Sequence, residues 1–244
     1  MTSALVLSGG LGTRLGEATQ NCPKPLLDVA GRPLLAHILQ NLARAGVTRA
    51  LVNVHFLPEH FDAFLEYWGP RLPAVTLHPE AALRGTAGTL RDVRAFLEED
   101  PGPFVVHYGD ILTDMLLTPL LDDARCGAHL GAVLLHRRSR PQSVATLEDG
   151  EVVAFEERPA WALASEVPQW TFSGIAALNP GIFPVLDELN ATDLPRDAFP
   201  ELARRRLLRA TPLAGARFAI DSLERLVQAR AAWSNHVALE NIHE

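Results

Sequence analysis

The residues best suited to chemistry lie near the amino terminus, in a glycine-rich stretch that follows a short apolar segment. After residues 4–7 the chain reads Ser8-Gly9-Gly10-Leu11-Gly12-Thr13-Arg14. Glycines let the backbone turn tightly and approach a ligand closely, and successive amide groups can form a concave nest that favours anions. Arg14 adds a permanent positive charge with a forked geometry. The stretch therefore predicts an anion-binding loop, with phosphate as the natural ligand.

Lys24 is the second residue of interest, because it is the single lysine among 22 basic side chains. It stands between Pro23 and Pro25, two rings that restrict the backbone. In a chain that uses arginine everywhere else, a retained lysine indicates a position where a compact ammonium group is required, such as direct contact with a phosphate. The alternative is a surface lysine retained by chance.

Two familiar nucleotide motifs are absent from the glycine stretch. Gly10-Leu11-Gly12 begins a dinucleotide fingerprint, but Leu15 occupies the third glycine position, and no acidic residue follows the second predicted strand. No glycine-lysine-serine/threonine string of the Walker A type occurs either. The remaining interpretation is a phosphate-binding loop that acts together with Arg14 and Lys24.

Asp110 and Asp221 are candidate metal ligands, since each follows a short apolar strand. Two carboxylates that converge on one point would hold a hard cation, and Mg²⁺ that bridges phosphates is the usual case. Taken singly, each aspartate is typical of a turn or a helix cap, and Asp114 competes with Asp110. Only the combination with the phosphate loop favours a metal site.

The first part of the chain alternates strands and helices. Apolar residues at positions 35, 38, 39 and 42 predict a helix that ends before Gly46, and the Gly85-Thr86-Ala87-Gly88 loop precedes another. Alternation at this spacing predicts a mostly parallel sheet with helices on both faces, where ligands bind beyond the carboxyl ends of the strands. The expected strands are 4–7, 49–54, 75–78 and 104–108, and the expected helices are 35–42, 58–68 and 89–97.

The pattern of predicted secondary-structure elements changes after Met115. Glu148-Asp149-Gly150-Glu151 separates two β-rich runs and predicts a hairpin. The Arg204-Arg205-Arg206 run could bind anions, but a solvated helix end is favoured over that alternative. No repeat or linker is evident, so one domain over residues 1–244 is expected, with halves at 1–115 and 116–221 and a C-terminal helix. The other expected elements are helices 115–124 and 198–206, a helix from about residue 222, and strands 130–135, 143–147, 152–156, 171–178 and 218–220.

Composition limits the partners. With 48% hydrophobic residues the chain can bury a large core, and a net charge of −7 argues against broad nucleic-acid binding. Cys22 and Cys126 are too few for a disulfide framework, which favours a reducing compartment. No apolar run reaches the length of a membrane span or a signal segment. These features predict a cytoplasmic protein without a membrane partner.

The sequence resembles the sugar-1-phosphate nucleotidylyltransferases, also called NDP-sugar pyrophosphorylases, over nearly its whole length. Within that family it resembles the mannose- and heptose-1-phosphate guanylyltransferases. The glycine stretch and Lys24 belong to the most specific block. The matching blocks are residues 9–15, 23–26, 29–34, 85–88, 109–110, 155–159, 171–175 and 221–226.

The resemblance implies a Rossmann-like, three-layer αβα fold with a mixed, mostly parallel sheet, in which a nucleotide half precedes a sugar half. It implies transfer of a nucleotidyl group from NTP to a sugar 1-phosphate, with Mg²⁺ as cofactor and release of pyrophosphate. By position, the implied roles are as follows. Arg14 and Lys24 are catalytic; Leu7, Gly9, Gly10, Gly12, Thr13, Glu80, Gly85 and Thr86 bind nucleotide; Glu157, Arg158, Ser173 and Gly174 bind the sugar phosphate; and Asp110 and Asp221 bind the metal.

The chain departs from the family at two positions. Arg158 stands where lysine is usual, and Ser222 follows Asp221 where the common pattern is Asp-x-Gly-Thr, which weakens Asp221 as a ligand. Glu80 stands where relatives read the base, and its carboxylate suits guanine N1–H and N2–H₂, which favours GTP with a mannose- or heptose-type sugar. Uridylyl or thymidylyl transfer, a non-catalytic nucleotide-sugar regulator and a glycosyltransferase are the alternatives. The enzyme is expected to be a monomer or a homo-oligomer.

Overall fold

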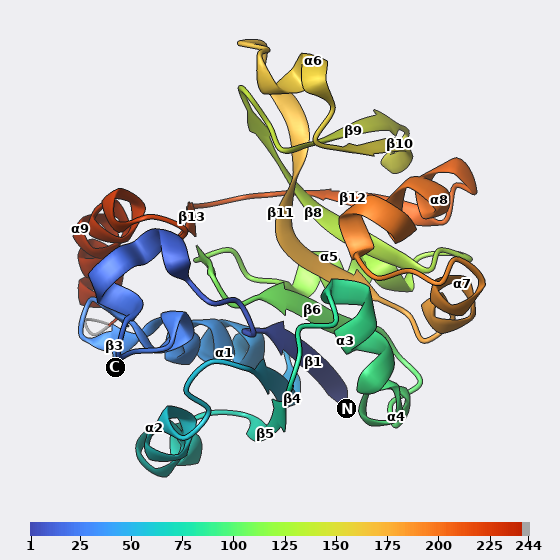
Figure 1. Cartoon of the computed structure of the whole chain (residues 1–244). Helices are drawn as coiled ribbons and strands as arrows, with labels where there is room; N and C mark the ends of the chain where they lie inside the picture. The colour runs from blue at the N-terminus through green and yellow to red at the C-terminus, as the bar shows by residue number, and fades with distance from the viewer. Residues whose placement is uncertain (241–244) are drawn as a thin grey trace.

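The structure, a computed structural model, describes residues 1–240, with side chains described through Ser234 (Figure 1). In this part of the chain, nine strands form one central sheet. They are β1 (Thr2–Leu7), β4 (Val47–Val54), β5 (Ala74–Pro79), β6 (Phe104–Tyr108), β8 (Gly131–Arg138), β9 (Ser143–Glu148), β10 (Glu151–Glu157), β11 (Gln169–Leu178) and β12 (Leu208–Pro212). Two small ribbons join β2 (Asp28–Val29) with β3 (Arg32–Pro33), and β7 (Ile111–Thr113) with β13 (Arg217–Ala219).

The strand order is β5-β4-β1-β6-β11-β8-β12-β10-β9, and both halves of the chain contribute to it. Among the described residues, four neighbouring pairs are parallel and four are antiparallel. The four strands of the first half are all parallel, as the strand and helix alternation predicted. The second half is mostly antiparallel, with β8–β12 as its parallel pair. The sheet is therefore mixed as predicted, and less dominated by parallel pairs than expected.

Helices cover both faces of the sheet, because successive strand residues point to opposite sides. Ala4 and Val6 of β1 belong to one buried core, and Leu5 between them belongs to the other. The first core packs against α1 (Leu34–Arg44), α2 (His60–Trp68), α5 (Thr118–Arg125) and α9 (Leu223–Glu240); the second against α3 (Thr86–Asp92), α4 (Arg94–Glu98), α7 (Ile182–Glu188) and α8 (Phe199–Arg204). Figure 1 shows these two helical layers on either side of the strands, which confirms the αβα expectation. Within residues 1–240, no helix combines the length and hydrophobicity that crossing a bilayer requires.

Most expected elements are present, and the differences have physical reasons. The expected helix 89–97 begins earlier, at Thr86, and is divided at Val93, whose ψ of 13° leaves the helical range. Strand β12 was not expected, because Leu208–Pro212 is short and contains both Arg209 and Pro212. It forms by parallel pairing with β8, a long-range contact without a local signal. The short strand β7, the four-residue helix α6 (Ala160–Leu163) and helix α7 were not expected either.

The arginine run at the end of α8 is a solvated helix end, which is the interpretation that the sequence favoured over an anion-binding site. Arg204 pairs with Glu201, Arg205 pairs with Glu188 and Glu201, and Arg206 pairs with Glu148 and Glu151. Each guanidinium of the run already has a carboxylate partner within the chain.

His107 in the middle of the sheet predicts acid sensitivity. It is 1% exposed on β6, and burial lowers its pKa to about 4. The unfolded chain therefore binds more protons between about pH 6.5 and pH 4, so the free energy of unfolding falls as the pH falls through that window. Between pH 7 and pH 4, we expect the free energy of unfolding of His107→Asn to decrease by about 3 kcal/mol less than that of the wild type. Denaturant unfolding at the two pH values measures this difference. The matched control is His60→Asn on the surface of α2; equal pH slopes for the two variants would contradict the prediction.

Candidate active site

The site is built where the carboxyl ends of β1 and β6 approach each other. The Gly109 N–H donates to the Leu7 carbonyl oxygen at 2.9 Å, and a Cβ at Gly109 would lie 2.5 Å from Ser8 Oγ. Only glycine permits this approach, which places Asp110 beside the glycine loop. The loop is held on its other side by Asn53 at the end of β4, whose Oδ1 accepts from the Ser8 N–H at 2.6 Å.

A first cavity of about 230 Å³ opens at this point and is called the glycine-loop cavity. It brings together residues that are up to about a hundred positions apart in the sequence. Seven of the ten residues expected to be catalytic or to bind nucleotide line it, together with the expected metal ligand Asp110. The expected residues that line it are Leu7, Gly9, Gly10, Lys24, Glu80, Gly85, Thr86 and Asp110.

Lys24 and Asp110 form an ion pair inside this cavity, with Nζ 2.8 Å from Oδ2. The lysine side chain is 13% exposed, so it is not a chance surface residue. It is held by the short helical turn η2 (Lys24–Leu26). The pair places a compact cation and a carboxylate side by side in the glycine-loop cavity.

Glu80 is buried in the same cavity, and only one of its oxygens is engaged. Oε1 accepts from the Thr89 hydroxyl at 2.6 Å. Oε2 is buried and has no hydrogen-bond partner among the described residues, although it lies close to the Gly9 backbone. A buried polar atom without a partner costs stability, so this oxygen is available to accept from a ligand in the cavity.

A second cavity of about 250 Å³, called the aspartate cavity, shares Tyr108 and Asp110 with the first. Asp110 and Asp221 both line it, 111 residues apart in sequence. They come together because β7 pairs with β13 and the Ile220 N–H donates to the Asp110 carbonyl oxygen at 2.8 Å. Asp221 is paired with Arg225 at 3.0 Å. The remaining expected residues that line this cavity are Arg14, Glu157 and Gly174.

The second-half candidates are placed differently from one another. Glu157 faces the aspartate cavity, and burial raises the pKa of its carboxyl group. Gly174 has a φ of +87° and lies against Tyr108 and Ile111. Ser173 is fully buried with its hydroxyl on His136 Nδ1 at 3.1 Å, and Arg158 is 65% exposed beside Glu157. Neither Ser173 nor Arg158 is among the residues that line these two cavities.

The remaining candidates of the glycine loop do not line the glycine-loop cavity. Gly12 has a φ of +65°, and a Cβ there would lie 3.3 Å from Lys24 Cβ, so this glycine lets the loop pack against Lys24. Thr13 is exposed at the start of the 3₁₀ helix η1 (Thr13–Thr19). Arg14 lines the aspartate cavity and not the glycine-loop cavity.

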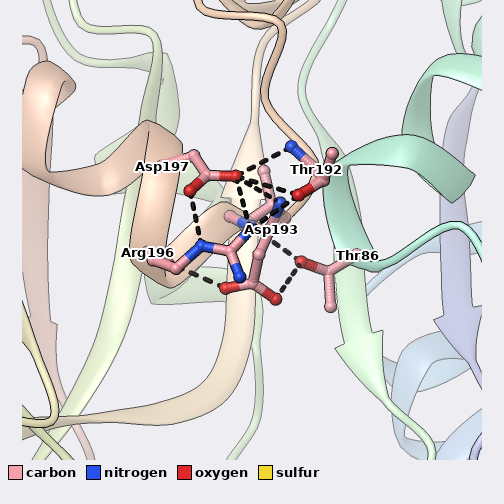
Figure 2. Close-up of polar contacts among 6 residues, drawn as sticks. Thr86, Thr192, Asp193, Arg196 and Asp197 are labelled. Carbon is pink, nitrogen blue, oxygen red and sulfur yellow. Dashed lines mark hydrogen bonds and ion pairs between the residues drawn. The ribbon is translucent and has the colours of Figure 1, made fainter.

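Thr86 joins the two halves of the chain through its hydroxyl group (Figure 2). The Thr86 hydroxyl donates to Asp193 Oδ2 at 3.1 Å and accepts from the Leu194 N–H at 2.7 Å. Asp197 in turn accepts from the Thr192 and Asp193 N–H groups at 2.8 and 2.9 Å and pairs with Arg196 at 2.7 Å.

Tyr108 lies between the two cavities. Burial, and to a lesser extent the negative charge of Asp193, raises the pKa of its hydroxyl group, which therefore stays protonated.

Several functional candidates were missed by sequence reasoning. Asn53 and Thr89 line the first cavity, and Arg138, Arg217 and Arg225 line the second. The polar Asn53 between two valines of a buried strand was a signal that could have been followed. The arginines had none, because nothing local distinguishes them from the other arginines of the chain.

A protein-family model described as nucleotidyl transferase matches residues 3–215. The chain belongs to the nucleotidyl transferase family. The family relatives include mannose-1-phosphate guanylyltransferase 1 of Arabidopsis thaliana, 30% identical over 87% of this chain and 59% of the relative. The mannose-1-phosphate guanylyltransferase catalytic subunit beta of Drosophila pseudoobscura pseudoobscura is 29% identical over 88% and 57%. The chain thus spans under two thirds of the length of these relatives.

Solved structures share the fold of this chain. A putative glucose-1-phosphate thymidylyltransferase from Bacillus anthracis has a TM-score of 0.82, with 20% identity and 96% of each chain covered. A UDP-glucose pyrophosphorylase complexed with UDP-glucose has a TM-score of 0.80, with 19% identity over 97% of this chain and 99% of that one. At these identities the likeness establishes the nucleotide-sugar transferase fold.

The junction at Gly85 yields a test of the fold around the site. Gly85 has φ 75° and ψ 168°, and a Cβ there would lie 2.3 Å from the Thr192 carbonyl oxygen. We expect Gly85→Ala to lower the free energy of unfolding by about 3 kcal/mol, from backbone strain plus the clash. The matched control is Gly31→Ala, where φ is +82° and no atom lies within 4 Å, with an expected loss of about 1 kcal/mol. Equal losses in denaturant unfolding would show that the contact with Thr192 does not matter.

Proposed function

We propose that this chain transfers a nucleotidyl group from an NTP to a sugar 1-phosphate, with GTP and a mannose- or heptose-type sugar favoured. The observation that supports it most directly is the meeting of the two cavities at Asp110 and Tyr108. One cavity has the glycine loop and Lys24, and the other has Arg14, Glu157 and Asp221. A nucleotide in the first and a sugar phosphate in the second would join at their shared wall.

The chemistry follows from that arrangement. An oxygen of the sugar phosphate attacks the α-phosphorus, and the bond from that phosphorus to the oxygen of the β-phosphate breaks, so pyrophosphate leaves. Such a transfer depends on positioning and cations more than on a strong base. We propose that Lys24, which lines the glycine-loop cavity, offsets the charge that builds up on the α-phosphate. Arg14 lines the aspartate cavity, and its proposed role is to bind phosphate oxygens from that side.

Asp110 and Asp221 fit a divalent cation by their donor chemistry. Both carboxylates line one cavity and are brought together by the β7–β13 pairing, and hard cations such as Mg²⁺ prefer oxygen ligands. In this structure each carboxylate has a basic neighbour, Lys24 or Arg225. We propose that these two residues would hold Mg²⁺, which when bound would neutralise phosphate charge.

Glu80 supports the choice of guanine. Its buried Oε2 lacks a partner among residues 1–240, and a carboxylate can accept from guanine N1–H and N2–H₂ together. A uracil or thymine edge presents a donor flanked by acceptors and is matched better by an amide. The names of the mannose-1-phosphate guanylyltransferase relatives agree with this preference.

Lys24 gives the first test of the proposal. We expect Lys24→Met to lower kcat for pyrophosphate release by about 10²- to 10³-fold while nucleotide affinity changes little, because its charge acts mainly on the transition state. Lys24→Arg keeps the charge and serves as the partner variant, with partial activity expected. Wild-type rates in Lys24→Met would count against a catalytic role for Lys24, whereas no pyrophosphate release by the wild type with any NTP and sugar 1-phosphate would favour a non-catalytic nucleotide-sugar regulator.

Base selection gives the second test, on a panel of GTP, UTP, dTTP, CTP and ATP with sugar 1-phosphates. We expect GTP to give the highest kcat/KM, and Glu80→Gln to lower that value by about tenfold or more, since the amide places a donor against the guanine donors. Glu59→Gln, an exposed change at the start of α2, is the control. Turnover of UTP or dTTP but not GTP by the wild type would overturn the guanine assignment while leaving the reaction class intact.

A further inference from the structure

Four arginines surround a third cavity, called the arginine cavity, beside the aspartate cavity. Its volume is about 380 Å³. Arg137 and Arg138 come from the end of β8, Arg217 from β13 and Arg225 from α9. No carboxylate is among the residues that line it in the described part of the chain. The concentration of positive charge is unexpected in a protein with a net charge of −7.

Internal partners account for only two of these guanidinium groups. Arg225 pairs with Asp221 at 3.0 Å, and Arg137 lies over the Trp170 ring at 5.2 Å. Neither Arg138 nor Arg217 has a carboxylate within 4.0 Å among the described residues. Arg217 donates through Nε to the Ser173 carbonyl oxygen at 2.9 Å. A largely buried cation without a counter-ion, such as Arg217, is costly, and the lack of a carboxylate partner distinguishes Arg138 and Arg217 from the fully matched run at 204–206.

Arg217 remains charged at neutral pH. Burial lowers the pKa of the Arg217 guanidinium to about 10, and nearby Asp110 opposes this decrease. His136, on the same wall, is neutral at pH 7, because burial together with Arg217 and Arg138 lowers its pKa to about 4. The cavity therefore offers two forked cations and an imidazole that can donate or accept a hydrogen bond.

The position of the arginine cavity indicates which substrate would reach it. It shares His136, Arg138, Arg217 and Arg225 with the aspartate cavity, where Glu157 lies, and no residue with the glycine-loop cavity. A group that extends from a sugar in the aspartate cavity can thus enter the arginine cavity, whereas a base bound in the glycine-loop cavity is not adjacent to it. Guanidinium forks match phosphate and carboxylate groups in charge and geometry.

We propose that the arginine cavity binds a second anionic group of the sugar substrate, a phosphate or carboxylate carried in addition to the anomeric phosphate. Arg138 and Arg217 are its specificity-determining residues. This assignment rests on the proposed function and narrows it, because the preferred acceptor becomes a sugar 1-phosphate that carries a further anionic group, and not one in which the anomeric phosphate is the only charged group.

The test compares three sugars that differ at one carbon. These are α-D-glucose 1-phosphate, α-D-glucuronic acid 1-phosphate and α-D-glucose 1,6-bisphosphate, titrated calorimetrically into the full chain. We expect at least one charged probe to bind the wild type about tenfold or more tightly than the neutral sugar, as charge-assisted hydrogen bonds require. Arg138→Met and Arg217→Met should reduce this preference to about twofold or less. Arg125→Met, an exposed α5 residue paired with Asp122, should retain it.

Three results would overturn the assignment. One is a wild type without preference for either charged sugar. Another is an equal loss for neutral and charged sugars in Arg217→Met, which would place the anomeric phosphate or a structural role there. The third is inorganic phosphate that binds in an Arg217-dependent manner without any preference among the sugars, which would indicate a free anion. Pyrophosphate release separates this proposal from the proposed function. Turnover of glucose 1-phosphate at least as good as that of the two charged sugars would overturn only the role of the arginine cavity. No pyrophosphate release with any sugar 1-phosphate would count against nucleotidyl transfer itself.

Discussion

The ion pair between Lys24 and Asp110 is the contact on which the arrangement of the site depends. It joins loops 86 positions apart at 2.8 Å, and it can form only because Gly109 lets the end of β6 lie against the end of β1. The same geometry puts the cation at the glycine loop and leaves the carboxylate on the wall shared by the two cavities. A lysine suits this position because its single ammonium group can contact both a carboxylate and an approaching phosphate.

The two halves of the chain meet through backbone as much as through side chains. The Thr192 carbonyl oxygen accepts from the Ala87 N–H at 3.0 Å, and Thr86 caps the start of the π-helical turn η4 (Leu194–Ala198). The first turn of α3, which borders the glycine-loop cavity, is thereby tied to the second half. These hydrogen bonds fix the position of α3 relative to the second half, since α3 cannot shift without breaking them.

Charge is distributed unevenly over an acidic molecule. Carboxylates pair with the arginines at the end of α8, whereas Arg138 and Arg217, which line the arginine cavity, have no carboxylate within ion-pair distance among the described residues. The metal candidates lie between these regions, with Asp110 near Lys24 and Asp221 near Arg225. Under the proposed function, anionic substrates would meet positive charge in both cavities, and a divalent cation at the two aspartates would compete with Lys24 and Arg225 for them.

Local sequence patterns determined much of this protein. The αβ alternation, the hairpin around Gly150 and the glycine loop follow from hydrophobic period and turn chemistry, and these signals act over a few residues. The Gly9 loop, the Gly85 loop and Asp110 were expected at the carboxyl ends of parallel strands, where loops meet at one edge, and residues of all three line one cavity together with Lys24 and Glu80. The tertiary structure alone decided the pairing of β12 with β8, the burial of Ser173, the exposure of Arg158 and the gathering of Arg138, Arg217 and Arg225. Those outcomes depend on contacts between distant segments, for which a single sequence carries no local signal.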